Sequence, residues 1–349
     1  MPNKVLVSII IPVYNVRPYL SRALESCINQ TIKEIEILII DDCGNDGAIE
    51  IAKAYAKVDE RIHIIHNERN LGTFGARISG VKYAKGLYIC YLDADDYLEQ
   101  DTCKLALNAL TQSLNNPSST SLNNHVIEKS LPDIVFFGMR FEPKSFKRMA
   151  PPVICEPLYQ EEILYRVFAH CATPPWHIWA KLYKASHMVA VCELIVAHMG
   201  ENVRLSMAED ALQSFWLCAL AQKSIGIKDK LYVYCASNVS ITRKIDQHTR
   251  DKKIADISRV IDEIVNLKEV PILRANPAFK DAQTHTINIL KSVRVLEHRY
   301  DGLLSNGGGG IRCLSLYLAS CFGSLAFHRK WQTYVRIALA LLTLGKIKI

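Results

Sequence analysis

The chain has 349 residues, 49% of them hydrophobic and 22% charged, a composition typical of folded globular proteins that excludes a disordered or fibrous chain. The net charge of +7 is unevenly distributed, because residues 311–349 hold six lysines and arginines and no acid, which leaves +1 for the rest. The body of the chain therefore lacks the basic surface of a nucleic-acid-binding protein.

The N-terminal part of the chain predicts alternating strands and helices. Apolar runs predict strands over residues 5–11, 35–40, 62–66, 87–92 and 133–138, and helical spacing predicts helices over 18–29, 48–58 and 74–85. Pro12 is expected to end the first strand. Strands that are apolar on both faces and separated by helices indicate a parallel sheet covered on both sides. The predicted fold class is α/β, with a Rossmann-like, mostly parallel sheet.

The remaining segments have a different character. Residues 113–130 are a polar insertion, which predicts a loop. From about residue 160 the pattern is mainly helical, with a short strand-like piece at 230–235. Residues 305–310 contain four consecutive glycines and predict a flexible linker before the basic tail. We therefore expect a mainly helical C-terminal region.

Asp93-Ala94-Asp95-Asp96 close the apolar run 87–92 and are the most informative segment of the chain. Three carboxylates at the end of a buried strand are too costly to bury without partners. Oxygen ligands at positions i and i+2 suit Mg²⁺ or Mn²⁺ that also binds the phosphates of a nucleotide. Taken alone, the segment is more typical of an acidic turn that starts a helix, and the sequence upstream is what favours a metal site.

Polar residues also follow the other predicted parallel strands. Tyr14-Asn15 follow the first strand, Asp41-Asp42 the second, and the segment from Asn67 to Asn70 the third. In parallel α/β sheets, ligands bind beyond the carboxyl ends of the strands. Four strand ends with clustered polar groups therefore predict one binding site along one edge of the sheet.

These residues resemble the family 2 glycosyltransferases, which have the GT-A fold. The matching segments in order are Val7–Asn15, Ser26–Thr31, Glu36–Asp42, Asn70–Gly72, Ala76-Arg77, Ala84–Gly86, Leu92–Asp96, and more loosely Trp179–Lys184, Glu209-Asp210 and Ser240–Arg243. The chain departs from the family pattern at Cys43–Gly47, where Gly-Ser-x-Asp-Gly is common, and at Ile78, where Asn is common. Both departures lie near the expected nucleotide site.

The resemblance implies a nucleotide-sugar donor, for which we expect a UDP-sugar, a divalent cofactor (Mn²⁺ or Mg²⁺), and inversion at the anomeric carbon. It implies that Arg77 approaches the diphosphate and that Asp93 and Asp95 hold the metal. The other donor-binding residues that it implies are Pro12, Tyr14, Asn15, Asp41, Asp42 and Asn70, together with Arg77 and Asp93.

The second half is expected to supply the catalytic base and the acceptor site. Asp210 is the candidate base and Glu209 its competitor, although the same two residues are also typical of an acidic first turn of a helix. Trp176 and His177 are candidates for acceptor binding, because aromatic faces stack on sugar rings, while Trp179 is also typical of a core anchor.

The predicted organisation has four parts: 1–145 for nucleotide-sugar binding, 146–243 for the acceptor and base, 244–310 as a helical extension with the linker, and 311–349 as a basic, apolar tail. The apolar runs of the tail are too short to span a bilayer. The tail is therefore expected either to lie on an anionic membrane surface or to pack on the body of the protein or on a partner.

The expected function is a metal-dependent, inverting hexosyltransferase that extends a surface glycan such as lipopolysaccharide or capsule, with a glycan or lipid-linked glycan as acceptor. Eleven cysteines without a C-x-x-C pair and the lack of a signal-peptide pattern predict a cytoplasmic location, with a peripheral position on the inner membrane face as an option. The alternatives are a nucleotidyltransferase, which usually has a Gly-rich loop after its first strand, and a non-enzymatic peripheral membrane protein.

Overall fold

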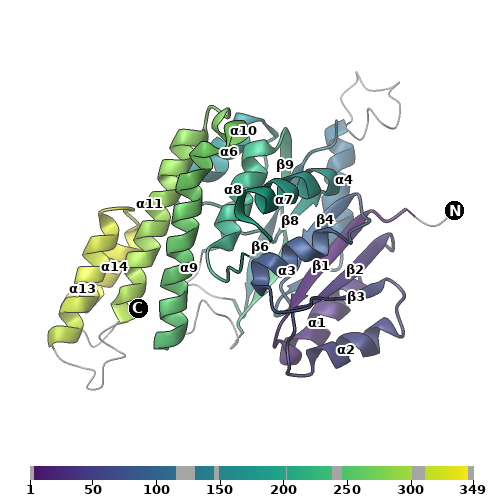
Figure 1. The fold of residues 1–349 in the computed structure, drawn as a ribbon, viewed down its shortest axis with the longest axis horizontal. Helices are drawn as coiled ribbons and strands as arrows, with labels where there is room; N and C mark the ends of the chain where they lie inside the picture. The colour runs from purple at the N-terminus through teal and green to yellow at the C-terminus, as the bar shows by residue number, and fades with distance from the viewer. Residues whose placement is uncertain are drawn as a thin grey trace.

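The structure, a computed structural model, describes residues 4–114, 130–144, 149–201, 203–237, 246–300 and 311–344 (Figure 1). Almost all of the predicted polar insertion at 113–130 lies outside these residues. The predicted linker at 305–310 and the Ser240–Arg243 segment lie entirely outside them.

A single mixed sheet forms the centre of the described fold, with the order β3-β2-β1-β4-β8-β6-β9-β5 and with β7 beside β9. The strands β3, β2, β1 and β4 are parallel, as predicted, and β8 then pairs antiparallel with both β4 and β6. The strands are β1 Val7–Val13, β2 Ile35–Asp41, β3 Ile62–His66, β4 Tyr88–Tyr91, β5 Tyr97–Leu98, β6 Ile134–Glu142, β7 Leu158–Tyr159, β8 Lys181–Lys184 and β9 Lys223–Cys235.

The first strand runs through Pro12 to Val13, although Pro12 was expected to end it. The carbonyl of Ile10 accepts a hydrogen bond from the amide of Leu92, so the polar groups of Ile10 face β4. Two residues further on, Pro12 faces the same side, where β4 has already ended at Tyr91. The missing N–H of Pro12 therefore removes no ladder hydrogen bond.

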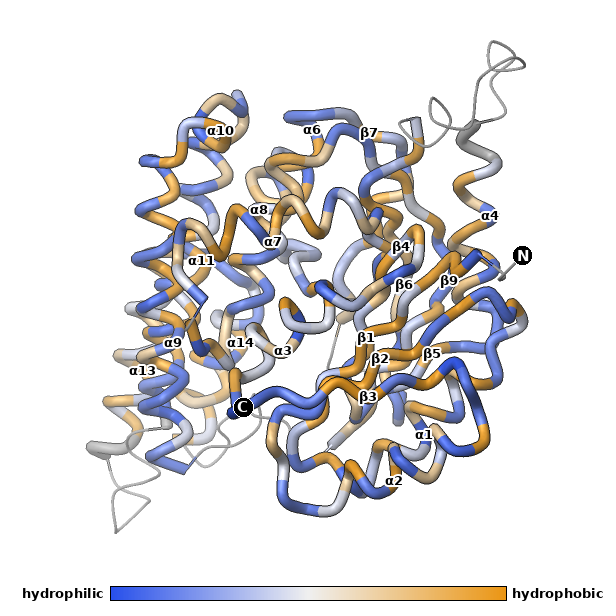
Figure 2. Tube along the Cα trace, turned by 45° about the vertical axis from the view of Figure 1, so that its right-hand side comes forward, coloured by the Kyte–Doolittle hydropathy of each residue, from blue (hydrophilic) through white to orange (hydrophobic). Residues whose placement is uncertain are grey.

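Helices cover both faces of the parallel part of the sheet. The crossover helices α1 and α2 pack against each other, whereas α3 packs on β1 and β2 and against α7. Figure 2 shows the apolar strands of the sheet enclosed by helices of mixed polarity. The helices of this part are α1 Arg17–Ile28, α2 Ala48–Ala56, α3 Gly72–Val81, α4 Thr102–Leu114, α6 Glu161–Leu164, η1 Tyr165–Ala169, α7 Ala185–Met199 and α8 Glu209–Leu220.

The C-terminal region is helical, as predicted. Figure 1 shows α9, α11, α13 and α14 side by side, away from the parallel strands. Its elements are α9 Gln247–Asn266, η3 Leu267–Glu269, α10 Pro271–Arg274, α11 Phe279–Glu297, η4 His298–Tyr300, α13 Ile311–Leu325 and α14 Trp331–Leu342. Buried residues of α9 and α11, such as Ile257 and Leu290, belong to the same apolar core as the sheet.

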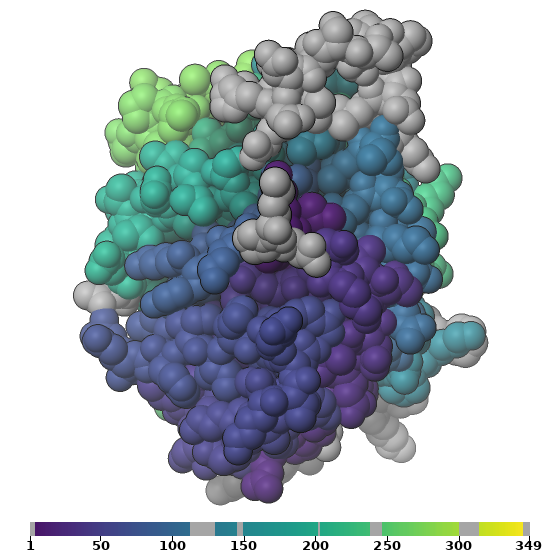
Figure 3. All heavy atoms as spheres, turned by 90° about the vertical axis from the view of Figure 1, so that its right-hand side faces the viewer, coloured from purple at the N-terminus to yellow at the C-terminus, as the bar shows by residue number. Residues whose placement is uncertain are grey.

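The N-terminal segments gather on one side of the molecule. Figure 3, which looks at this side, shows the purple and blue atoms of the early chain as one continuous surface below the teal atoms of the middle segments. The strands β1, β2 and β4 of this part are paired in parallel, so their carboxyl ends lie at one edge of the sheet.

Candidate active site

A cavity of about 650 Å³ lies at the carboxyl ends of β1, β2 and β4. It is lined by the loops after these strands and by the segments around Trp176 and Asp210. Predicted site residues that line it are Pro12, Tyr14, Asn15, Asp42, Arg77, Asp93, Asp95, Trp176, Glu209 and Asp210. Asp41, Asn70 and His177 do not line it.

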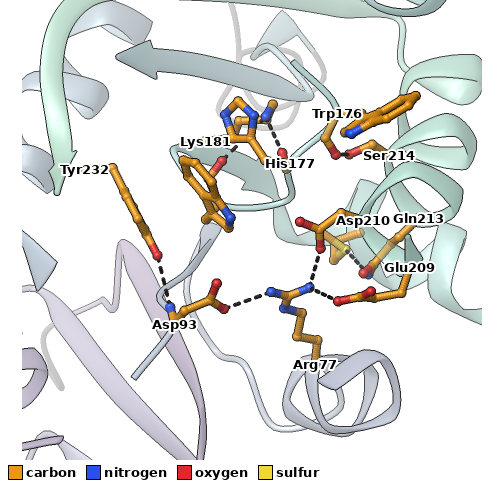
Figure 4. A network of polar contacts seen from close by, with 12 residues as sticks. Arg77, Asp93, Trp176, His177, Lys181, Glu209, Asp210, Gln213, Ser214 and Tyr232 are labelled. Atoms are coloured by element: carbon orange, nitrogen blue, oxygen red, sulfur yellow. Dashed lines mark hydrogen bonds and ion pairs between the residues drawn. The ribbon is translucent and has the colours of Figure 1, made fainter. Parts of the chain in front are cut away.

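Arg77 is the centre of a charged cluster in this cavity (Figure 4). Its side chain, only 2% exposed, projects from α3. One terminal nitrogen lies 2.8 Å from Oδ1 of Asp93, and the other lies 2.5 Å from Oδ1 of Asp210 and 3.5 Å from Oε1 of Glu209. Residues more than a hundred positions apart are thus joined by one guanidinium, which can bind several carboxylates in fixed geometry.

The cluster has more carboxylates than cations. Burial and the repulsion between the carboxylates raise the pKa of several of these groups. Burial and the neighbouring charge of Asp210 raise the pKa of Glu209 to about 8. Burial also raises the pKa of Asp210, and Arg77 opposes this shift. Burial and the charge of Asp93 raise the pKa of Asp95. Burial alone lowers the pKa of Arg77, but Asp210, Asp93 and Glu209 together raise it.

Glu209 and Asp210 form the first turn of α8, which confirms the interpretation as an acidic helix start, and the role of Asp210 as a base stays a prediction. The helix begins directly after Ala208, whose φ of 62° is in the left-handed region. A non-glycine residue in this region costs about 1–3 kcal/mol and is commonly found at functional sites. This turn directs the two acidic side chains toward Arg77.

Asp96 is buried, contrary to the expectation that the carboxylates after β4 stay out of the core. Its carboxyl group accepts hydrogen bonds of 2.7 Å from the hydroxyl of Tyr232 and from the amide of Cys235. Burial, together with Asp93 and Asp95, raises the pKa of Asp96 to about 8, so near neutral pH the group is largely uncharged. Asp96 therefore fixes the turn that carries Asp93 and Asp95, and the cost of burial is met by partners on β9.

Asp42 has a similar structural role on the other side of the cavity. Its carboxylate accepts hydrogen bonds from the amides of Leu71 and Gly72 at 2.7 and 2.9 Å, and from the side chain of Asn67 at 2.9 Å. It thereby caps α3, which begins at Gly72 and ends at Val81, whereas the sequence pattern predicted 74–85. A cap supplied by a distant segment, here the loop after β2, leaves no local signal in the sequence.

Three other predicted donor-binding residues are engaged within the protein. Asp41 lies 2.7 Å from Nδ1 of His66. The side chain of Asn70 donates to the backbone carbonyl of Asp42, and Oδ1 of Asn15 accepts from the amide of Asn45. These contacts shape the loops around the cavity, and nucleotide contacts by these residues stay predictions.

The aromatic segment after Pro175 divides between two roles. Trp176 lines the cavity and packs on Phe168, with ring centroids 6.1 Å apart. Trp179 also lines the cavity and stacks on Tyr232 at 4.6 Å, so it is both a core anchor and part of the site. The imidazole of His177 packs on Trp179 at 4.1 Å, and burial lowers its pKa well below the usual value.

Comparison with known proteins identifies the family. The sequence profile of glycosyl transferase family 2 matches residues 8–119. The uncharacterized glycosyltransferase EpsJ of Bacillus subtilis (strain 168) is 30% identical over 264 residues, which cover 72% of this chain and 69% of EpsJ. The chain belongs to glycosyl transferase family 2.

Other relatives of this glycosyltransferase agree with the assignment. The glycosyltransferase GlyA of Streptococcus pneumoniae serotype 4 is 29% identical over 240 residues, 68% of this chain and 31% of GlyA. A crystal structure of S. aureus TarS 1-349 in complex with UDP-GlcNAc superimposes with a TM-score of 0.54 and 16% identity, covering 93% of this chain and 82% of TarS. This likeness confirms the predicted GT-A fold. Family membership also decides against the nucleotidyltransferase and non-enzymatic alternatives.

The carboxylates of the glycosyltransferase suit a divalent cation that is shared with a ligand. Among the residues that the structure describes, no three His, Cys, Asp or Glu side chains are grouped to hold a metal by themselves. Asp93 and Asp95 nevertheless line the cavity at i and i+2, and burial and Asp93 raise the pKa of Asp95, which marks an excess of negative charge. Hard oxygen donors in such surroundings fit Mg²⁺ or Mn²⁺ completed by phosphate and water.

Several cavity residues of the glycosyltransferase were not predicted. Ile257 of α9 with Leu290 and Val293 of α11 line the cavity. Their sequence signal is only the apolar spacing of helices, which is the same for core and site residues. Tyr234 of β9 also lines the cavity, from a strand that begins seven residues earlier than the predicted 230–235 segment.

Proposed function

We propose that this glycosyltransferase moves a hexose from a UDP-sugar to a hydroxyl group of a growing surface glycan, such as lipopolysaccharide or capsule. We further propose that the reaction inverts the anomeric carbon and uses Mn²⁺ or Mg²⁺. The observation that carries the proposal is the meeting of Asp93 and Arg77 from the first half with Asp210 from the second half in one cavity. The bound UDP-GlcNAc of the structurally similar TarS supports a UDP-sugar donor.

The donor is proposed to lie between the loops after β1 and β2 and the turn at Asp93. Tyr14 is 48% exposed at this end, so its ring is open to stacking on a nucleobase. Pro12 provides a rigid wall next to it. The diphosphate would then come close to Arg77 and to Asp95, which is where the predicted cation is needed.

Sugar transfer breaks the bond between the anomeric carbon and the diphosphate while the acceptor oxygen forms a new bond from the opposite face. Asp210 is proposed to take the proton of that hydroxyl group, a role worth about 10²–10⁴-fold in rate. Arg77 holds Asp210 in place before the reaction and stabilises negative charge that develops on the leaving group. When bound, the divalent cation would supply Lewis-acid stabilisation of the same charge.

The acceptor is proposed to bind beside Trp176 and the residues of α9 and α11 that line the cavity. Leu290 and Val293 give this part of the cavity an apolar wall, and the indole of Trp176 adds an aromatic face. Both suit the apolar faces of sugar rings. The carboxylates at the centre of the cavity then lie between donor and acceptor.

The donor and metal assignments can be tested by thermal unfolding with UDP-sugars in the presence and absence of Mn²⁺. A ligand present at about 100 times its Kd raises the free energy of unfolding by about 2.7 kcal/mol. We expect UDP with Mn²⁺ to raise the Tm of the wild type, and Asp95→Ala to lose the part of this shift that depends on Mn²⁺.

The matched control is Asp262→Ala, which removes an exposed aspartate of α9 away from the cavity. It should keep the whole shift. A wild type that no UDP-sugar stabilises with or without Mn²⁺ would refute the donor class. An Asp95→Ala protein with the full Mn²⁺ effect would refute the metal assignment alone.

We also propose that the C-terminal tail is a peripheral membrane contact. Thr333, Ile337 and Ala340 of α14 face the protein, whereas the opposite side of the helix and its end expose large apolar groups. These exposed groups are Trp331 (61%), Tyr334 (50%), Val335 (41%), Leu341 (51%) and Leu342 (82%). In the described part of the chain no helix is long and apolar enough to cross a membrane. An apolar face in a segment with six cations and no acid suits an anionic bilayer surface.

The double variant Trp331→Ser/Leu342→Ser should lose most sedimentation with vesicles of phosphatidylglycerol and phosphatidylethanolamine, because the apolar groups that enter the interface are gone. Val58→Ser is the matched control, since Val58 is 82% exposed but belongs to the N-terminal part of the chain. Both proteins should keep soluble transferase activity. Equal sedimentation of the double variant and the control would refute the membrane contact.

A further inference from the structure

Asp256 is a partly buried aspartate of α9 that has no part in the mechanism above. It does not line the cavity, although its neighbour Ile257 does. Oδ2 of its carboxylate accepts a hydrogen bond of 2.9 Å from the backbone amide of Ser206. Lys252, one turn earlier on α9, donates from Nζ to the hydroxyl of the same serine at 3.2 Å. Two side chains of α9 therefore hold Ser206, shortly before the proposed base Asp210.

The segment 203–208 leads directly into α8, and its last three residues line the cavity. The carbonyl of Ala208 accepts hydrogen bonds from the amides of Ala211 and Leu212 at 3.1 and 3.4 Å. These bonds close the helical turn that carries Asp210. The position of the segment therefore determines where the carboxylate of Asp210 lies.

Ala208 needs support from its surroundings, because its φ of 62° is in the left-handed region. Such a conformation costs about 1–3 kcal/mol at a non-glycine residue and persists only where neighbouring contacts hold it. The hydrogen bond from Ser206 to Asp256 is a contact of this kind, two residues before the strained position. The ionised acceptor makes it stronger than a bond between two neutral groups.

The segment also rests on the first turn of α3. Gly72 has a φ of 71°, and a Cβ at this position would lie 3.1 Å from Cγ of Arg204 and 3.2 Å from the carbonyl oxygen of Leu205. Glycine therefore allows the two backbones to approach closely. The segment thus contacts both α3, which carries Arg77, and α9, which carries Asp256.

We propose that Asp256 is a positioning residue that fixes the backbone ahead of α8, so that Asp210 faces the reacting hydroxyl group. Arg77 binds the carboxylate of Asp210 directly, whereas Asp256 acts on it through the backbone. This inference rests on the proposed role of Asp210 as the base. It gives the C-terminal helical region a part in the reaction.

The test compares kcat and KM of Asp256→Ala and Asp256→Asn with the wild type. The reaction measured is the release of UDP, with Mn²⁺ and with water in place of the glycan, from the UDP-sugar that stabilises the wild type most. We expect Asp256→Ala to lower kcat by about 10–100-fold, because a displaced base is no longer aligned with the attacking oxygen. The KM for the UDP-sugar and the thermal shift with UDP should stay at the wild-type values, since Asp256 does not line the cavity. Asp256→Asn keeps an oxygen that accepts from Ser206, so it should keep most of the turnover.

Glu263→Ala is the matched control, because Glu263 is a buried carboxylate of the same helix that lies 2.6 Å from Arg259 and 3.8 Å from His198. Its loss weakens contacts of α9 but leaves the hydrogen bond to Ser206 in place. This variant should keep the kcat of the wild type. Wild-type kcat in Asp256→Ala would overturn the proposal, as would an equal loss in Glu263→Ala or no recovery in Asp256→Asn.

Amide hydrogen exchange of residues 203–210 gives a second measure that does not depend on activity. Loss of the hydrogen bond to Ser206 should make these amides exchange at least about tenfold faster in Asp256→Ala, because the segment opens more often. Asp256→Asn and Glu263→Ala should exchange here at nearly the rate of the wild type. Unchanged exchange in Asp256→Ala would mean that Asp256 does not hold the segment, and the proposal would fall.

Asp210→Asn separates this failure from a failure of the proposed mechanism. If Asp210→Asn keeps normal turnover, Asp210 is not the base and both proposals fall. If Asp210→Asn loses turnover while Asp256→Ala keeps that of the wild type, only the role of Asp256 is refuted.

Discussion

Asp210→Asn is expected to lower turnover by at least about 100-fold while UDP-sugar binding is retained. Asparagine has nearly the same shape as aspartate and can still accept a hydrogen bond from Arg77. It cannot take a proton from the acceptor hydroxyl. The measurement is the initial rate of transfer at saturating donor, together with the thermal shift caused by UDP and Mn²⁺.

Glu209→Gln is the matched control, because Glu209 precedes Asp210 and is the competing candidate base. Burial and Asp210 raise the pKa of Glu209 to about 8, so at pH 7 it already carries a proton most of the time. Replacing Glu209 by the neutral glutamine should therefore lower turnover by less than about 10-fold. If Glu209→Gln lost more turnover than Asp210→Asn, Glu209 and not Asp210 would be assigned as the base.

The parallel half of the sheet and its site-bearing edge could be predicted from the sequence because both depend on local patterns. Apolar runs reveal buried strands, and the carboxyl ends of parallel strands meet at one edge, so Asp93, Asp95 and Asp42 could be assigned to one region before their distances were known. The start of α3 could not be predicted, because its cap is Asp42, which follows β2 about thirty residues earlier in the chain. Asp96 was misjudged for a similar reason, since its partners lie on β9.

The second half of the site was less accessible to sequence analysis. The position of Trp179 in the cavity and the wall from α9 and α11 both depend on the packing of segments far apart in the chain. Glu209-Asp210 were found through the family resemblance, because the local pattern is equally that of an acidic helix start and their contact with Arg77 leaves no signal in the sequence.

Arg77→Met is expected to lower the free energy of unfolding by about 3–5 kcal/mol, the usual cost of leaving buried carboxylates without their partner. Among the described residues, Arg77 is the sole cation within 4 Å of Asp93, Glu209 or Asp210. Urea unfolding at pH 7.5 measures the effect. Arg61→Met, which removes a partly exposed guanidinium paired with Asp59 outside the cavity, should cost far less.

Two further measurements distinguish lost pairing from lost packing. The double variant Arg77→Met/Asp210→Asn should be destabilised less than the sum of the single variants, because one unpaired charge is removed with the cation.

The loss of free energy of unfolding in Arg77→Met should also become smaller between pH 7.5 and pH 5, since the raised pKa values of Glu209 and Asp210 let both groups take up protons as the pH falls. A cost that is additive and independent of pH would mean that Arg77 stabilises the fold through packing alone. The central ion cluster would then not be what joins the donor half to the base.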